Sequence, residues 1–296
     1  MAECSIPVDL YNPGQVFACL GLLELSDQLV GNAQGAFDWS EPTRTCFRLI
    51  ALEDESPVER VIAFLRNASV TARSPSKSEL SAEPWSVTTL QMDVNREAFP
   101  FPAPDSPATL PVRLMCDDEY FDLIHWGEDV RSCGRDNVKF WAGAGGYPGA
   151  ALAQDALALI KEMRGDITAD PLNASARQSS SFRFDWRRDY VPMEIGFSLN
   201  AHSGDRFCAV GYPIVEMLAA VGLSFARPKR ISKLEYHYGV VSSPGGKPLL
   251  DPIFLRAALG TAILPFCQRS FRMKLGWPGK ENQARCITTV EDLCVS

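Results

Sequence analysis

The segment Ser5-Ile-Pro-Val-Asp-Leu-Tyr-Asn-Pro-Gly-Gln-Val-Phe-Ala-Cys-Leu-Gly-Leu-Leu-Glu-Leu-Ser-Asp-Gln-Leu-Val-Gly31 decides how the fold begins. Residues 5–10 form a short apolar run that predicts a β-strand. Asn12 is a favoured helix N-cap, and Pro13 suits the first helical position because its missing N–H needs no partner there. Apolar residues then recur at helical spacing until Gly31, which predicts the end of the helix. A strand is expected over 35–39, so the chain opens as strand, helix, strand.

The same order of elements repeats in the next segment. Residues 45–52 alternate apolar and polar side chains and predict a strand. Ser56-Pro57-Val58-Glu59 has the pattern of a capping box, in which the Ser and Glu side chains satisfy free N–H groups of the first helical turn. We therefore expect a helix that starts at Pro57 and continues through Leu65.

The remaining pattern predicts an α+β fold with mixed or antiparallel sheets. Helices are expected over 150–163, over 213–221 with Gly222 as the end, and from Pro252 with Asp251 as the cap. Strands are expected over 86–94, 193–198, 206–210 and 231–241, followed by a hairpin of 268–277 and 284–290. These elements follow no regular βαβ order, which is typical of α+β proteins. The organisation is either an acidic α+β region over 1–165 and a basic α+β region over 166–296, or one continuous domain.

The composition indicates a globular protein without a membrane span. Of the 296 residues 46% are hydrophobic, enough to fill one large core or two modest ones. No segment approaches the roughly 20 consecutive apolar residues that a spanning helix requires. The N-terminus lacks the basic start and apolar segment of a signal peptide, so we expect a cytoplasmic protein. Nine scattered cysteines without a Cys-x-x-Cys pair are typical of reduced thiols and indicate no structural metal.

Charge is distributed unevenly along the chain. Residues 1–150 contain 11 Lys and Arg against 22 Asp and Glu, whereas residues 171–290 contain 16 against 8. Affinity for a polyanion depends on the local density of cations, so the second region can bind nucleic acid despite the net charge of −7. A basic surface that only balances the acidic half is the alternative.

The run Ser-Phe-Arg-Phe-Asp-Trp-Arg-Arg-Asp-Tyr over residues 181–190 concentrates arginine and aromatic side chains. Arginine offers a planar fork for phosphate, and aromatic rings offer faces on which bases stack. On a strand, Arg183 and Arg187 would share a face with Asp185, and we expect both arginines to point outward and contact phosphate. Trp186 then either stacks on a base or packs in the core.

Other segments repeat this basic and aromatic chemistry. Residues 139–149, Lys-Phe-Trp-Ala-Gly-Ala-Gly-Gly-Tyr-Pro-Gly, precede a predicted helix and let the backbone approach a phosphate. The segment matches no nucleotide-binding motif, and its other interpretation is a tight turn into the helix. Residues 272 and 274 share one face of a predicted strand whose other face is apolar. The further residues expected to bind nucleic acid are Lys139, Trp141, Gly143, Gly145, Gly146, Arg188, Lys229, Arg230, Lys233, Arg272 and Lys274.

Catalytic and metal-binding patterns are weak. The three histidines occur in no zinc-binding spacing, and no Gly-x-Ser-x-Gly nucleophile motif is present. Acids between Asp117 and Asp129 could gather a hard cation, although such clusters are usually solvated surface. We therefore predict a non-enzymatic protein with no catalytic residue, cofactor or metal. The alternatives are a nucleotide- or metal-dependent enzyme that uses the glycine-rich segment and these acids, and a structural adaptor.

Four parts of the chain together resemble a known family. They are Ile6–Glu24, Lys139–Gly143, Phe182–Tyr190 with Gly196–Asn200, and Arg272–Lys280 with Gln283–Cys286. They resemble the Csb family of CRISPR-associated proteins from type I-U (I-G) systems, which is regarded as large-subunit-like. The resemblance implies a non-catalytic subunit of a Cascade complex, in which guide RNA supplies sequence specificity and protein contacts the backbone. It also implies recognition of the short protospacer-adjacent motif. The partners that it implies are other Cascade subunits, guide RNA, target double-stranded DNA and the helicase-nuclease.

Overall fold

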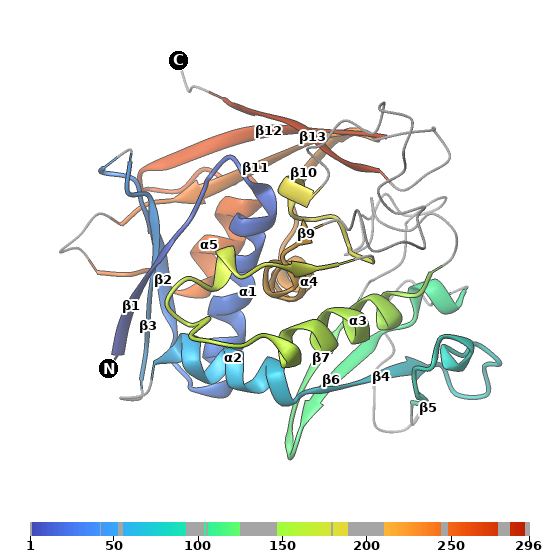
Figure 1. Ribbon diagram of the computed structural model, residues 1–296. Coiled ribbons are helices and arrows are strands. Elements are labelled where there is room, and N and C mark those ends of the chain that lie inside the picture. The colour runs from blue at the N-terminus through green and yellow to red at the C-terminus, as the bar shows by residue number, and fades with distance from the viewer. Residues whose placement is uncertain are drawn as a thin grey trace.

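The computed structural model confirms the α+β fold, because its described residues form both helices and several sheets with mixed and antiparallel strands. The helices lie at the centre and along one side of the molecule, and the sheets surround them (Figure 1). The structure describes residues 2–41, 43–52, 56–92, 104, 106–124, 147–178, 180–188, 210–243, 248–277 and 285–293.

The predicted opening of the chain is present, with small shifts at the ends of the elements. Strand β1 (Ala2–Pro7) leads to helix α1 (Pro13–Leu29), and strands β2 (Gln34–Asp38) and β3 (Cys46–Ala51) follow. β3 pairs antiparallel with both other strands, which gives the sheet order β1-β3-β2. The Asn12 side chain accepts a hydrogen bond from the Gly14 N–H at 3.1 Å, which confirms Asn12 as the N-cap.

The second predicted unit leads into another sheet. Ser56 caps helix α2 (Pro57–Asn67), since its hydroxyl accepts a hydrogen bond from the Glu59 N–H at 3.5 Å. The sheet has the order β5-β4-β6-β7 and consists of β4 (Ser69–Ser74), β5 (Thr89–Gln91), β6 (Val112–Cys116) and β7 (Glu119–Leu123). The hairpin of β6 and β7 is absent from the predicted elements, because its turn carries the acids that were interpreted as a solvated cluster. Helix α3 (Gly149–Glu162) packs beside α2.

A four-stranded antiparallel sheet follows in the C-terminal part. Its order is β10-β11-β12-β13, formed by β10 (Lys229–Ser232), β11 (Glu235–Val241), β12 (Gln268–Gly276) and β13 (Cys286–Asp292). Strands β12 and β13 confirm the predicted terminal hairpin. The single strand predicted over 231–241 is wrong, because the chain turns at residues 233–234 and pairs β10 with β11. Helix α5 (Pro252–Leu259) lies between β11 and β12 in the chain.

Helix α4 (Pro213–Phe225) packs against α1 through two glycines. A Cβ on Gly21 would lie 1.8 Å from the Leu218 carbonyl oxygen, and one on Gly222 would lie 2.3 Å from the Phe17 carbonyl oxygen. The two backbones are therefore in direct contact where any side chain would separate them. This contact explains why the predicted helix end at Gly222 is wrong: α4 continues to Phe225, and the glycine serves helix packing rather than termination.

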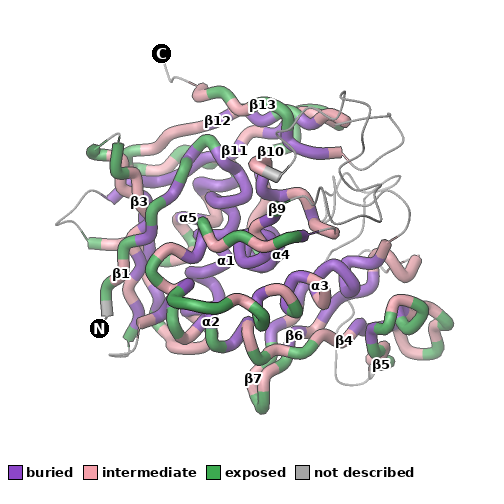
Figure 2. Tube along the Cα trace, in the orientation of Figure 1, coloured by how far each residue is buried: buried purple, intermediate pink, exposed green. Residues whose placement is uncertain are grey.

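One hydrophobic core joins the two predicted regions. Its buried side chains come from positions between Ile6 and Ile287 and include most of α1 and α4 (Figure 2). Bridges between Gly35 and Leu250 and between residues 37 and 242 also connect the N-terminal sheet to the C-terminal part. No helix among the described residues is long and apolar enough to cross a membrane.

Several short elements complete the described chain. They are the 3-10 helices η1 (Glu83–Trp85), η2 (Pro107–Thr109), η4 (Pro171–Asn173) and η5 (Trp186–Arg188), and the strands β8 (Ala176–Arg177) and β9 (Val210–Gly211). β8 and β9 pair antiparallel. The strand predicted over 193–198 and most of the one predicted over 206–210 lie outside the described residues.

Candidate functional site

Residues 181–188 do not form the strand that their alternation predicts. Arg183 has a φ of 63°, and its N–H donates a hydrogen bond to the Ser181 hydroxyl at 2.8 Å. Phe182 and Phe184 both lie in the core, as alternation would place them, and their rings stack with centroids 5.3 Å apart. The departure from the predicted strand is at Asp185, which is buried as well instead of sharing an outward face with Arg183. The 3-10 helix η5 follows directly.

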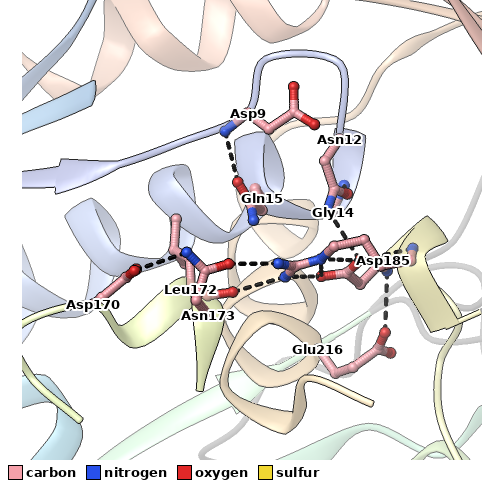
Figure 3. Close-up of polar contacts among 10 residues, drawn as sticks. Asp9, Asn12, Gly14, Gln15, Asp170, Leu172, Asn173, Asp185 and Glu216 are labelled. Carbon is pink, nitrogen blue, oxygen red and sulfur yellow. Dashed lines mark hydrogen bonds and ion pairs between the residues drawn. The ribbon is translucent and has the colours of Figure 1, made fainter. Parts of the chain in front are cut away.

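Asp185 is the centre of a buried polar network (Figure 3). Its side chain is 0% exposed and accepts hydrogen bonds from Asn12 Nδ2 and from the Arg187 backbone N–H, both at 3.0 Å. The Asp185 N–H donates to Glu216 Oε1 on α4 at 3.1 Å. A buried carboxylate requires such partners, because an unpaired charge is costly to desolvate. Asp185 thereby connects this segment to the N-terminus of α1 and to α4.

The Arg187 guanidinium completes this network, so the prediction that it points outward is wrong. Nε and Nη2 bind both carboxylate oxygens of Asp185 at 2.6–3.1 Å. Nη2 also donates to the Leu172 carbonyl at 2.7 Å, and Nη1 donates to Asn173 Oδ1 at 2.6 Å. The guanidinium carbon lies 3.4 Å from the centroid of the Tyr212 ring, a cation–π contact. Arg187 therefore fixes η5 against η4, with 25% of its side chain exposed.

The exposed part of Arg187 forms one wall of a pocket of about 900 Å³. The loop between β1 and α1, the segment between β2 and β3, and Arg269 of β12 supply other parts of the wall. Gln15 lines the pocket although its residue is only 3% exposed, and its Oε1 accepts a hydrogen bond from the Asp9 N–H at 2.7 Å. Figure 3 shows Gln15 between Asp9 and the Leu172–Asn173 turn.

Arg269 is held at the pocket by residues from two directions. Its Nε donates to Asp292 Oδ2 at 3.2 Å, and its Nη2 donates to the same oxygen and to the Tyr11 hydroxyl, the latter at 3.3 Å. Burial alone would lower the pKa of Arg269, but the hydrogen bond and the charge of Asp292 raise it. Arg269 is absent from the predicted site, as are Asp9 and Gln15, because these residues meet only in the folded chain.

The outer face of the C-terminal sheet carries several of the predicted cations. The predicted alternation of β12 is confirmed, since Phe271 and Met273 are buried while Arg272 is half-buried and Lys274 is exposed. On β10 and in the turn after it, the exposed cations are Lys229, Arg230 and Lys233. Arg230 lies opposite the buried Tyr236, so its position belongs to the other face of the sheet. Lys229 lies opposite His237 in the β10–β11 register, and His237 lies opposite Arg272 in the β11–β12 register. The cations of this face therefore come from β10, the turn after it, and β12, and β10 and β12 flank β11.

Carboxylates offset part of this charge. Arg272 pairs with Glu291, and this hydrogen bond raises the pKa of Arg272 and lowers the pKa of Glu291. His237 Nε2 lies 3.3 Å from Glu235 Oε1. Three cations of this sheet form no ion pair with any described residue: Lys229, Lys233 and Lys274.

Several of the predicted residues lie outside the described part of the chain. The glycine-rich segment lies outside the described residues, and so do its expected contacts Lys139, Trp141, Gly143, Gly145 and Gly146. The described part of Arg188 is its backbone, in η5. Trp186 is half-buried and packs against the core, which favours the packing role over base stacking.

Two of the four described acids of the predicted cluster are engaged in ion pairs. Glu119 pairs with Arg60, and Asp122 forms two hydrogen bonds of 2.7 Å with Arg113 across the β6–β7 hairpin. No group of three metal-binding side chains occurs among the described residues, and residues 128 and 129 lie outside them.

The described cysteines are free thiols. Burial raises the pKa of Cys4 to about 12 and raises that of Cys19 as well. Thiols with such raised pKa values stay protonated and are poor nucleophiles and metal ligands. These two cysteines therefore act as small apolar side chains.

Comparison of the chain with protein-family models, with curated proteins and with solved structures gives no match. The functional assignment therefore depends on the residues of the chain itself. Two features are available for it: the pocket beside Arg187, and the cationic outer face of the C-terminal sheet.

Proposed function

We propose that the chain is a non-catalytic subunit of a type I CRISPR guide-RNA surveillance complex, Cascade, and that it contacts the backbone of bound nucleic acid. The sequence segments that resemble the Csb family support this assignment. In such a complex base pairing with the guide reads the target, while protein binds backbone and the short adjacent motif. The proposed partners are the other Cascade subunits, guide RNA, target double-stranded DNA and the helicase-nuclease, and the setting is the cytoplasm.

The observation that carries the proposal is the group of exposed lysines on the C-terminal sheet. Lys229, Lys233 and Lys274 form no ion pair with a described residue, so their charge is available to a polyanion. Lysines that neutralise phosphates release the counterions condensed on the nucleic acid, which makes the affinity depend on salt. We assign the phosphate contact to this face rather than to Arg187, because Asp185 balances the charge of that guanidinium.

The four acids of the predicted cluster that lie among the described residues do not favour the enzymatic alternative. Two of them, Glu119 and Asp122, pair with arginines, so a cation would have to displace Arg60 and Arg113 to reach them. A non-enzymatic role therefore stays the proposal.

A salt titration of the reconstituted complex tests the proposal. The variant replaces Lys229, Lys233 and Lys274 by Gln, and target duplex binding is measured over a range of salt concentrations. If each lysine neutralises one phosphate, the slope of log affinity against log salt falls by about 2.7 in magnitude, at roughly 0.9 per phosphate.

The matched control replaces three exposed cations elsewhere by Gln: Lys161, Arg164 and Arg177. It has the same change in net charge, so it should leave the slope close to that of the wild-type complex. Equal slopes for the two triple variants would show that the sheet does not bind the backbone. Failure of the chain to enter a complex with guide RNA and the other subunits would remove the proposed function altogether.

A further inference from the structure

We infer that the pocket beside Arg187 binds a single unstacked nucleobase, with a preference for guanine. The inference rests on the proposed function, which brings single-stranded nucleic acid to the protein, and it adds a site that reads a base. Proteins that recognise unpaired nucleotides hold the splayed base against aromatic side chains and bind its hydrogen-bonding edge. A volume of about 900 Å³ is within the range of small-molecule pockets and admits a nucleotide.

The buried amide of Gln15 is the first indication of a ligand. The residue is 3% exposed and lines the pocket, and its Oε1 is occupied by the Asp9 N–H. Its Nε2 forms no hydrogen bond with a described residue. Nε2 is not one of the fully buried polar atoms that lack a partner, so solvent reaches it from the pocket, and a carbonyl oxygen of a ligand would take the place of that solvent.

Both arginines of the wall have donors left for a ligand. Each guanidinium has five N–H groups. Arg187 uses only one of the two N–H groups on Nη1, in its bond to Asn173, and Arg269 Nη1 forms no hydrogen bond with a described residue. Because Asp185 and Asp292 fix the two guanidinium groups, these donors are positioned before a ligand arrives.

Asp9 provides the acceptor that selects the base. Its Oδ1 accepts a hydrogen bond from the Tyr11 N–H at 2.9 Å, and its Oδ2 forms no hydrogen bond with a described residue. Guanine combines acceptors at O6 and N7, which suit arginine and amide donors, with N–H donors at N1 and N2, which suit a carboxylate. Trp39 and Tyr11 also line the pocket and add aromatic surface for the ring.

The charges disfavour an isolated phosphate as the ligand. The positive charge of Arg187 is balanced by Asp185 and that of Arg269 by Asp292. With Asp9 in the wall, the five groups have a net charge of about −1, counted from the ordinary ionisation of these side chains. A neutral base with both donors and acceptors fits this set better than a phosphate does.

The test measures binding of fluorescently labelled oligouridylates that differ at one central position, which is guanosine, adenosine, cytidine or uridine. Fluorescence anisotropy on the full chain gives the four affinities. We expect the guanosine oligonucleotide to bind about tenfold more tightly than the others, a factor typical of one well-formed set of base contacts. Asp9→Asn, which puts an amide donor opposite the donors of guanine, should remove the preference.

The matched control is Glu41→Gln, since Glu41 is an exposed carboxylate (67% for its side chain) outside the residues that line this pocket. It should keep the preference. Equal affinities for all four oligonucleotides in the wild-type protein would overturn the inference but leave the proposed function intact, provided that the lysine variant still weakens binding. The inference would also be overturned if inorganic phosphate competed equally well with all four oligonucleotides. If no oligonucleotide binds and the chain enters no guide-RNA complex, both the inference and the proposed function are lost.

Discussion

Replacing Arg187 by Ala should destabilise the fold rather than only weaken nucleic-acid binding. The substitution leaves the fully buried Asp185 carboxylate without its ion-pair partner and removes the hydrogen bonds to Leu172 and Asn173. Loss of one partner from a buried ion pair costs about 3–5 kcal/mol. Asp185 keeps its bond from Asn12, and a quarter of the Arg187 side chain is exposed, so we expect the lower end, about 3 kcal/mol.

The assay is urea unfolding followed by circular dichroism, together with the thermal midpoint. For a chain of this length about 3 kcal/mol corresponds to a fall in Tm of roughly 6 °C. Adding Asp185→Asn should recover part of the loss, because a neutral amide is cheaper to bury than an unpaired carboxylate. Arg177→Ala is the matched control: its residue is exposed in β8, and the expected change is within about 0.5 kcal/mol.

Two results would contradict this account of Arg187. One is an Arg187→Ala variant as stable as Arg177→Ala, which would mean that the guanidinium is not part of the fold. The other concerns the double variant Arg187→Ala/Asp185→Asn. If Asp185→Asn destabilises the Arg187→Ala protein by as much as it destabilises the wild-type protein, the two side chains are not coupled.

Three further outcomes are expected. Gly21→Ala should cost about 2 kcal/mol in urea unfolding even though alanine favours a helix by about 1 kcal/mol, because its Cβ would lie 1.8 Å from a carbonyl oxygen of α4. Gly260→Ala, whose Cβ would meet no atom closer than 3.6 Å, should lose less. Burial raises the pKa of Glu24 above 4.5 despite its pairing with Arg256. Between these two pKa values the folded chain keeps a proton that the unfolded chain has lost, so the free energy of unfolding falls as pH rises from about 4.5 through the raised pKa. A Glu24→Gln variant should show a flatter pH dependence of the free energy of unfolding in that window. The same pH dependence in the variant and the wild-type protein would refute the assignment. Ser56→Ala should cost about 1 kcal/mol through loss of the α2 cap, measured by the same unfolding assay, and no loss would show that the cap is dispensable.

The sequence by itself determined the elements whose signals are local. Asn12 and Ser56 mark helix starts because a cap bonds an N–H only two or three residues away. The alternation around Arg272 predicts one exposed face of β12, since successive side chains of a strand point to opposite sides. The α+β class follows from the order of such elements.

Tertiary structure alone decided the features that depend on distant partners. Gly222 has the local pattern of a helix end, but its position against α1 keeps it inside α4. Arg187 has the pattern of a phosphate contact, yet the network of Asp185 and the η4 turn directs it inward. The pocket joins residues as far apart as Asp9 and Arg269. A sequence pattern has a range of about one helical turn, whereas a buried charge or a helix contact is settled by whichever distant groups the core brings to it.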